Sequence, residues 1–183
     1  MNKIFNATTT PDILCISGLK NSGKSTLIEA LIPLLAESGV RTAVIKHHGH
    51  GFGTEIPDKP GTDTYRFLAA GACGTVIYDD DTLALVKRQA VKAEDLAAYF
   101  PEADLILIEG AKNESYPRII MLRTGQNISD VTDEPGTLLC AVTDPDYDKS
   151  ALPENLLRFD FGDYAAICSF ILLARVIVEI PLD

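Results

Sequence analysis

One short segment constrains the fold of this chain more than any other feature. Gly18-Leu19-Lys20-Asn21-Ser22-Gly23-Lys24-Ser25 fits the pattern Gly-x-x-x-x-Gly-Lys-Ser/Thr. An apolar run, 12–17, precedes it, and apolar residues at helical spacing follow over 27–35. In this context the pattern predicts a strand, a phosphate-binding loop and a helix. Backbone N–H groups of the loop and the helix N-terminus are expected to surround a phosphate.

The side chains of the loop have distinct expected roles. Lys24 is predicted to reach the β- and γ-phosphate oxygens, and the Ser25 hydroxyl to bind Mg²⁺. The rest of the predicted phosphate-binding set from the loop is Gly18, Asn21, Ser22 and Gly23. The alternative is a plain glycine-rich turn that exposes a lysine.

The remaining pattern predicts an α/β fold. Gly39 is a helix stop, and the apolar segment 40–46 completes a βαβ unit whose two strands should be parallel. Further strands are expected at 104–109, 118–123 and 138–142, and helices at 93–100 and 163–178. We therefore expect a three-layer P-loop NTPase fold, with a mostly parallel sheet and helices on both faces. One domain should span 1–183, with 1–11 as a flexible N-terminal extension.

A less regular segment separates these elements. Residues 47–63 lack periodicity and predict a long loop. A helix is expected at 62–71, followed by strands at 73–78 and 83–87 around an acidic turn.

Charge and cysteine content exclude several classes of protein. The chain of 183 residues has 16 Lys and Arg against 26 Asp and Glu, a net charge of −10 that disfavours nucleic acid as a ligand. The four cysteines form no C-x-x-C pair and are expected to be core residues of a reducing compartment. The apolar stretch near the N-terminus is too short for a secretory signal, and the longest apolar run is interrupted by Arg175 and Glu179. The expectation is a cytoplasmic protein without a membrane segment.

A second acidic group is needed to hold Mg²⁺ or its water shell. Glu109 ends the 104–109 run and precedes Gly110, so it is placed like a Walker-B acid. The alternative is a strand-end carboxylate in water. Asp104 begins the same strand and should lie at the opposite edge, as a cap or surface charge.

All three histidines follow the second strand, in Lys46-His47-His48-Gly49-His50. They should lie on the carboxyl edge of the sheet, where ligands bind in open α/β folds. Three roles are consistent with this pattern: contact with phosphate or an anionic substrate, a zinc site, and a solvated loop. Asp63 is predicted either to bind Mg²⁺ or position water, or to cap the next helix.

The base-reading Asn-Lys-x-Asp sequence is absent. The nearest substitute is Asp144, which follows the 138–142 strand and could accept hydrogen bonds from guanine N1 and N2. A turn that begins at Asp144 before Pro145 is the alternative.

Four segments in this order, GLKNSGKSTL, IKHHGH, KPGTDTYRFLAAGA and LILIEGAK, closely resemble the molybdopterin-guanine dinucleotide biosynthesis protein B family. They lie between Gly18 and Lys112. The resemblance implies a P-loop fold of the signal-recognition and MinD-like class, GTP binding with Mg²⁺, slow GTP hydrolysis and a homodimer. It also implies partnership with the guanylyltransferase that joins GMP to molybdopterin, with molybdopterin or its guanine dinucleotide as a further ligand.

The resemblance also assigns residues. It implies that Gly23, Lys24, Ser25 and Thr26 bind the phosphates and Mg²⁺. It places His47, His50, Asp63 and Arg66 in a switch-like segment. Glu109, Gly110 and Lys112 match a Glu-Gly-aromatic-Lys motif of the family. The predicted catalytic residues are Lys24, Asp63 and Glu109, and the predicted metal ligands are Ser25, Asp63 and Glu109. The chain departs from the family at Thr62, where lysine is usual, and at Ala111, where an aromatic residue is usual.

These observations predict a GTP-binding protein with weak GTPase activity that assists attachment of GMP to molybdopterin. The alternatives are a P-loop small-molecule kinase and a non-catalytic, nucleotide-stabilised dimeric adaptor. Measurement of turnover separates the three. A GTPase releases the γ-phosphate as free phosphate, a kinase transfers it to an acceptor, and a scaffold shows no turnover.

Overall fold

The computed structural model describes residues 11–48, 58–132 and 135–179. The chain divides into two compact units, Met1–His47 with Ala93–Asp183 and His48–Lys92, called here the first and second units. The predicted site residues from Gly18 to His47, and those from Glu109 to Asp144, lie in the first unit. The expectation of one domain over 1–183 stays a prediction. Residues 1–10 of the predicted N-terminal extension lie outside the described residues.

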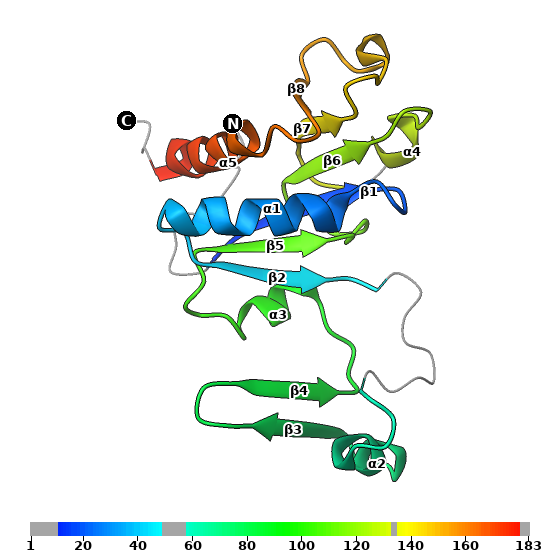
Figure 1. Cartoon of the computed structure of the whole chain (residues 1–183), viewed down its shortest axis with the longest axis vertical. Coiled ribbons are helices and arrows are strands. Elements are labelled where there is room, and N and C mark those ends of the chain that lie inside the picture. The colour runs from blue at the N-terminus through cyan, green and yellow to red at the C-terminus, as the bar shows by residue number, and fades with distance from the viewer. Residues whose placement is uncertain (1–10, 49–57, 133–134, 180–183) are drawn as a thin grey trace. The chain divides into compact units, whose positions relative to one another are not determined.

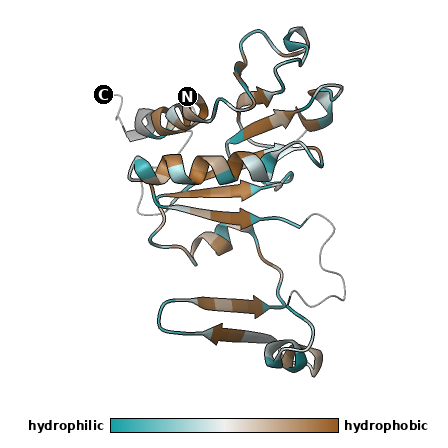
Figure 2. Ribbon diagram, viewed as in Figure 1, coloured by the Kyte–Doolittle hydropathy of each residue, from teal (hydrophilic) through white to brown (hydrophobic). Residues whose placement is uncertain are grey.

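The first unit contains a six-stranded sheet of order β2-β5-β1-β6-β7-β8, and every neighbouring pair in it is parallel (Figure 1). Its strands are β1 (Asp12–Gly18), β2 (Thr42–Lys46), β5 (Leu105–Glu109), β6 (Arg118–Leu122), β7 (Leu138–Thr143) and β8 (Leu157–Asp160). The inner strands are continuously apolar, as Figure 2 shows, because both faces of a parallel sheet are covered. The predicted mostly parallel sheet is confirmed.

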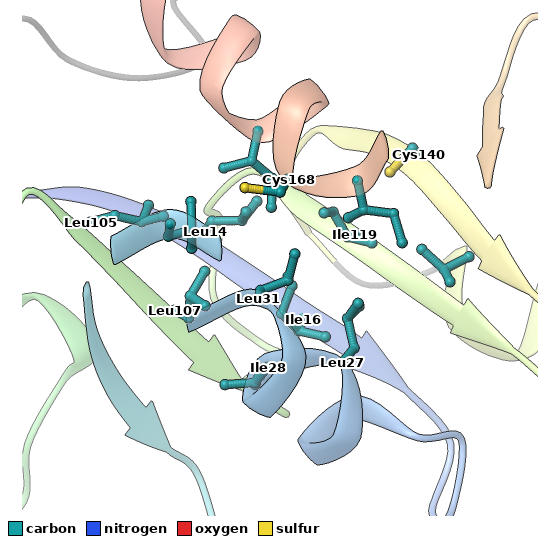
Figure 3. Packing of buried hydrophobic residues seen from close by; sticks show 14 of the residues in the cluster. Leu14, Ile16, Leu27, Ile28, Leu31, Leu105, Leu107, Ile119, Cys140 and Cys168 are labelled. Carbon is teal, nitrogen blue, oxygen red and sulfur yellow. The ribbon is translucent and has the colours of Figure 1, made fainter. Parts of the chain in front are cut away.

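Helices cover both faces of this sheet. α1 (Lys24–Glu37) and α5 (Tyr164–Glu179) pack on one face. Figure 3 shows side chains of α1 meeting Leu14 and Ile16 of β1 and Leu105 and Leu107 of β5. Alternate residues of β1 and β5 point to the other face, toward α3 (Ala93–Ala97). On that face, residues of β6 and β7 cluster with residues of α4 (Ser129–Thr132) and with Leu152, which follows a 3₁₀ helix (Lys149–Ala151). The three-layer fold is therefore confirmed.

The second unit contains one helix and one hairpin. The helix, α2 (Asp63–Ala69), is capped by Thr62, whose side chain accepts a hydrogen bond from the Tyr65 N–H at 3.2 Å. Thr62 is thus the N-cap, and Asp63 is the first helical residue. β3 (Gly74–Tyr78) and β4 (Leu83–Lys87) pair antiparallel. In their acidic turn, Asp79 accepts hydrogen bonds from the N–H groups of Asp81 and Thr82, which confirms the predicted hairpin.

Some features differ from the sequence prediction. The edge strand β8, the short helix α4 and the 3₁₀ helix were not predicted, because each has at most four residues and too short a pattern to detect. The prediction that all four cysteines are core residues is wrong for Cys73, which is exposed. Within the described residues, no helix is long and apolar enough to cross a membrane.

The amino edge of the sheet is fixed by an ion pair between Asp104 and Arg41. Asp104 accepts hydrogen bonds from Arg41 Nε and Nη2, both at 2.9 Å, and from the Arg41 backbone N–H at 2.8 Å. These bonds join the chain segments that enter β2 and β5. Side-chain hydrogen bonds from Arg41 hold the pKa of Asp104 at about 2, below its ordinary value of 3.8.

We predict that Asp104→Asn lowers the free energy of unfolding at pH 7 by at most about 1 kcal/mol, because solvent screens this half-exposed pair. A lowered folded-state pKa stabilises the protein above the unfolded-state value of 3.8, and this stabilisation is lost as the pH falls toward 2. Urea unfolding of both proteins at several pH values measures the difference. A difference that stays constant from pH 7 to pH 3 would contradict the assignment.

Candidate functional site

A cavity of about 490 Å³ lies at the carboxyl end of β1. Ligands bind at this edge in open α/β sheets. The lining residues are Lys20, Asn21, Ser22, Gly23, Lys24, Ser25, Thr26, Lys46, Glu109 and Arg123. The structure thus brings the glycine-rich loop together with Glu109, which is 84 residues beyond Ser25 in the sequence.

The backbone of the loop has the shape expected for phosphate binding. Asn21 and Gly23 have positive φ angles of 63° and 90°. Residues in the left-handed conformation can direct the backbone N–H groups of a loop toward one side, which makes a concave anion site. The helix α1 begins immediately afterwards, with the Leu27 N–H donating to the Gly23 carbonyl at 2.9 Å. The N-terminal end of its dipole therefore faces the cavity.

The Lys24 ammonium contacts the backbone of the loop. It donates hydrogen bonds to the carbonyl oxygens of Leu19 at 2.8 Å and Gly18 at 3.2 Å. Lys24 therefore adds a positive charge at the same place where the N–H groups converge. This arrangement is suited to a di- or triphosphate.

Ser25 and Glu109 form the candidate metal site. The Ser25 hydroxyl lies 3.1 Å from both carboxylate oxygens of Glu109. Hydroxyl and carboxylate oxygens suit Mg²⁺, which usually binds one or two protein carboxylates and completes its shell with phosphates and water. Within the described part of the chain, no group of three or more His, Cys, Asp and Glu could hold a metal by itself. The donor set therefore fits Mg²⁺ together with a phosphate ligand.

Lys46 also contacts Glu109. The parallel register of β2 and β5 places the two residues side by side, and the Lys46 ammonium lies 3.1 Å and 3.2 Å from the two carboxylate oxygens. This ion pair was not predicted from the sequence.

Arg123 is a second cavity residue that was not predicted. It directly follows β6, and its guanidinium lies 4.0 Å from the ring centroid of Phe161 and pairs with Asp144. A cation over an aromatic face and beside a carboxylate is held in one orientation. Its position, a basic residue immediately after a central strand, is the only sequence signal for it.

Asp144 lies at the end of β7, outside the set of cavity-lining residues. One carboxylate oxygen accepts a hydrogen bond from Arg123, and the other accepts one from the Thr124 N–H at 3.0 Å. Burial acts to raise its pKa, but the bonds from Thr124 and Arg123 outweigh burial and lower the pKa. Its role as a guanine reader stays a prediction, and in the structure it anchors Arg123.

The residues that directly follow β2 and β5 are held by backbone hydrogen bonds to neighbouring strands. The His47 N–H donates to the Glu109 carbonyl at 3.0 Å. Gly110 has a φ of 80°, and its N–H donates to the Ile16 carbonyl at 3.0 Å. Lys112 is exposed, whereas Ala111 is buried beside Cys15 and Ile108. None of these four residues after the strands lines the cavity, and His50 lies outside the described residues.

Asp63 and Arg66 belong to the second unit. They form an ion pair with each other on the exposed side of α2. Their expected contacts to Mg²⁺ and phosphate stay predictions.

The parallel sheet, the glycine-rich loop between β1 and α1, and the acid at the end of β5 define a P-loop NTPase fold. Comparison with known proteins identifies the family. A model of the family "Molybdopterin guanine dinucleotide synthesis protein B" matches residues 13–144, and the chain belongs to this family. The resemblance seen in the sequence motifs is confirmed.

Individual relatives agree with this assignment. A probable molybdopterin-guanine dinucleotide biosynthesis adapter protein of Bacillus subtilis is 36% identical over 118 residues, which cover 63% of this chain and 68% of the relative. The adapter protein of Escherichia coli is 34% identical over 120 residues, which cover 62% of this chain and 66% of the relative. The matches thus span about two thirds of each relative.

Solved structures extend the likeness over more of the chain. The structure of Bacillus subtilis MobB has a TM-score of 0.70 and 28% identity, and covers 88% of this chain and 96% of that chain. A MobB homologue from Bacillus stearothermophilus has a TM-score of 0.67 and 21% identity, and covers 90% of this chain and 98% of that chain. At 21% identity, the second likeness shows the fold alone.

The loop geometry predicts that Gly23→Ala is more damaging than Gly39→Ala. Both glycines have positive φ, 90° and 78°, so alanine is strained at either place by about 1 to 2 kcal/mol. Only at Gly23 would the new Cβ also meet the Arg123 guanidinium and Phe161, whereas nothing lies within 4 Å at Gly39. Urea unfolding compares the two losses. Equal losses would show that Arg123 and Phe161 do not pack against the loop.

Proposed function

We propose that this protein is an adapter of molybdopterin guanine dinucleotide biosynthesis that binds GTP with Mg²⁺ in the P-loop cavity. The observation that carries this proposal is the contact between Ser25 and Glu109 beside Lys24. These residues are the hydroxyl, acid and lysine that P-loop proteins use for a metal-bound triphosphate. The names of the relatives supply the pathway.

The charges around the cavity support a polyanionic ligand. The chain as a whole carries a formal charge of −10. The described residues that line the cavity, in contrast, include Lys20, Lys24, Lys46 and Arg123 and a single carboxylate, Glu109. A local cluster of cations in an acidic protein concentrates a small anion while the overall field repels long polyanions.

The proposed GTPase activity is weak. Within the described parts of the chain, Glu109 is the one carboxylate that lines the cavity, and it contacts Ser25 and Lys46. Among the residues that the structure describes, the cavity lining includes no histidine and no second acid that could position the attacking water. When bound, Mg²⁺ supplies charge stabilisation for the phosphates. The residues of the chain itself bind and orient the nucleotide, which fits an adapter better than a fast hydrolase.

The proposed partner is the guanylyltransferase that joins GMP to molybdopterin. An adapter would present nucleotide, molybdopterin or its guanine dinucleotide to that enzyme. The small-molecule kinase is the alternative that shares the loop, and the non-catalytic scaffold is the alternative without turnover. Incubation with GTP and molybdopterin, followed by separation of the phosphorylated products, distinguishes them. Slow release of free phosphate supports the proposal, and transfer of the γ-phosphate to an acceptor would favour the kinase.

We further propose that the protein is a homodimer, with the β3–β4 hairpin in the interface. The antiparallel register places Val76, Tyr78, Leu83 and Leu85 on one face, and all four side chains are exposed. A two-stranded sheet is marginally stable alone and needs further packing. A second copy could supply that packing, since an exposed apolar patch of this kind commonly marks an interface.

Replacement of Tyr78 by aspartate tests the proposed dimer. Tyr78 is 80% exposed, so the change should cost little stability in a single chain but place an unpaired charge in the interface. We expect Tyr78→Asp to elute as a monomer where the parent is a dimer, as measured by light scattering after gel filtration. Tyr99→Asp makes the same chemical change at another exposed tyrosine and serves as the control. Dimers of both variants would exclude the hairpin face.

Removal of the Lys24 charge tests the nucleotide site. We expect Lys24→Ala to weaken Mg·GTP binding by at least about tenfold, because charge-assisted hydrogen bonds contribute about 1.5 to 3 kcal/mol. Lys87→Ala removes the same charge from the end of β4 and is the control. Calorimetric titration with GTP and ATP gives both affinity and base preference. An unchanged dissociation constant for Mg·GTP in Lys24→Ala would exclude the P-loop cavity as the site.

A further inference from the structure

The pairing of Glu109 with Lys46 has a consequence for the metal site. Glu109 is confined, with a side chain only 13% exposed, whereas the Lys46 side chain is 64% exposed. The ammonium contacts both oxygens of the same carboxylate that the Ser25 hydroxyl contacts. Lys46 therefore provides a positive charge next to the two groups that fit Mg²⁺.

We propose that Lys46 is a tethered counter-ion of the metal site, which pairs with Glu109 until Mg²⁺ displaces it. The proposal rests on the proposed function, because it assigns the same cavity to Mg²⁺ and a phosphate ligand. A lysine ammonium is a compact point charge on a flexible stem, and it leaves a partner more readily than a bidentate arginine does. Mg²⁺ carries twice the charge and binds carboxylate oxygens directly, so it competes for the same two atoms.

The first consequence concerns nucleotide binding in the absence of metal. Without a cation beside it, the Glu109 carboxylate would repel the phosphates that the loop attracts. Lys46 neutralises this charge. Nucleotide binding should thus depend less on Mg²⁺ in the parent protein than in a variant that lacks the Lys46 charge.

The second consequence concerns affinity for the metal itself. Mg²⁺ must break the ion pair between Lys46 and Glu109 before it can bind the carboxylate. Removal of the lysine charge should therefore strengthen metal binding. A lysine that served only as a phosphate ligand would have no such effect on the metal.

Lys46→Met is the informative variant, because it keeps an unbranched apolar stem and removes the charge. Lys20→Met is the matched control, since Lys20 lines the same cavity and its loss measures the general effect of one less positive charge there. Direct titration with Mn²⁺, followed by electron paramagnetic resonance without nucleotide, reports metal binding alone. We expect Lys46→Met to bind Mn²⁺ at least about fivefold more tightly than Lys20→Met, in line with removal of a competing like charge.

A second measurement uses nucleotide. Affinity for a fluorescent GDP analogue is compared in EDTA and in excess Mg²⁺. For Lys46→Met, we expect the dissociation constant in EDTA, divided by that in excess Mg²⁺, to be larger than for the parent and for Lys20→Met. Glu109→Gln introduced into Lys46→Met should abolish the gain in Mn²⁺ affinity, because the carboxylate is then absent.

The outcomes separate this proposal from the proposed function. Equal or weaker Mn²⁺ binding by Lys46→Met than by Lys20→Met would overturn the role of Lys46. Failure of the parent protein to bind GTP would overturn the proposed function, and the Mn²⁺ titration would still decide the role of Lys46.

Discussion

The site depends on the parallel pairing of β5 with β1. Their register pairs Glu109 with Ile16, which lies in β1 just before the glycine-rich loop that begins at Gly18. This pairing brings the Glu109 carboxylate to the Ser25 hydroxyl. Shifting the register by one residue would turn every side chain of β5 to the opposite face. Leu105 and Leu107 pack in one core cluster and Ile106 and Ile108 in another, so such a shift would require both clusters to be repacked. The hydrophobic core thus determines where the acid lies.

The sequence could predict the parts of the site that are local. A phosphate loop requires consecutive residues, so the segment from Gly18 to Ser25 was identifiable from its pattern, and Glu109 from its place at the end of an apolar run. Lys46 and Arg123 were missed because their roles come from neighbours distant in sequence. The partner of Lys46 is set by the register of β2 with β5, and Arg123 is held by side chains that follow β7 and β8.

The same distinction applies to the fold. Strands with strong apolar patterns and the helices α1 and α5 were predicted close to their observed bounds. The edge strand β8 was not, since its four residues are too short a pattern to detect and pair only with β7. Asp144 shows the same limit: its place after a strand suggested a base reader, which stays a prediction, and only the folded chain shows its hydrogen bonds from Arg123 and Thr124.

Asp104 and Glu109, at opposite ends of the same strand segment, pair with different cations, and the difference follows from the chemistry of those cations. At the amino edge, Arg41 binds Asp104, and Arg175 binds Asp12 at 2.8 Å while it donates to the Asp104 carbonyl at 3.1 Å. Planar guanidinium groups with several donors fix the starts of the strands and the last helix in one geometry. At the carboxyl edge, Arg123 is held by Asp144 and Phe161, but the cations that contact the loop carbonyls and Glu109 are the lysines Lys24 and Lys46. Ammonium groups on flexible stems can exchange one oxygen partner for another, and such exchange is what a site for phosphate and Mg²⁺ requires.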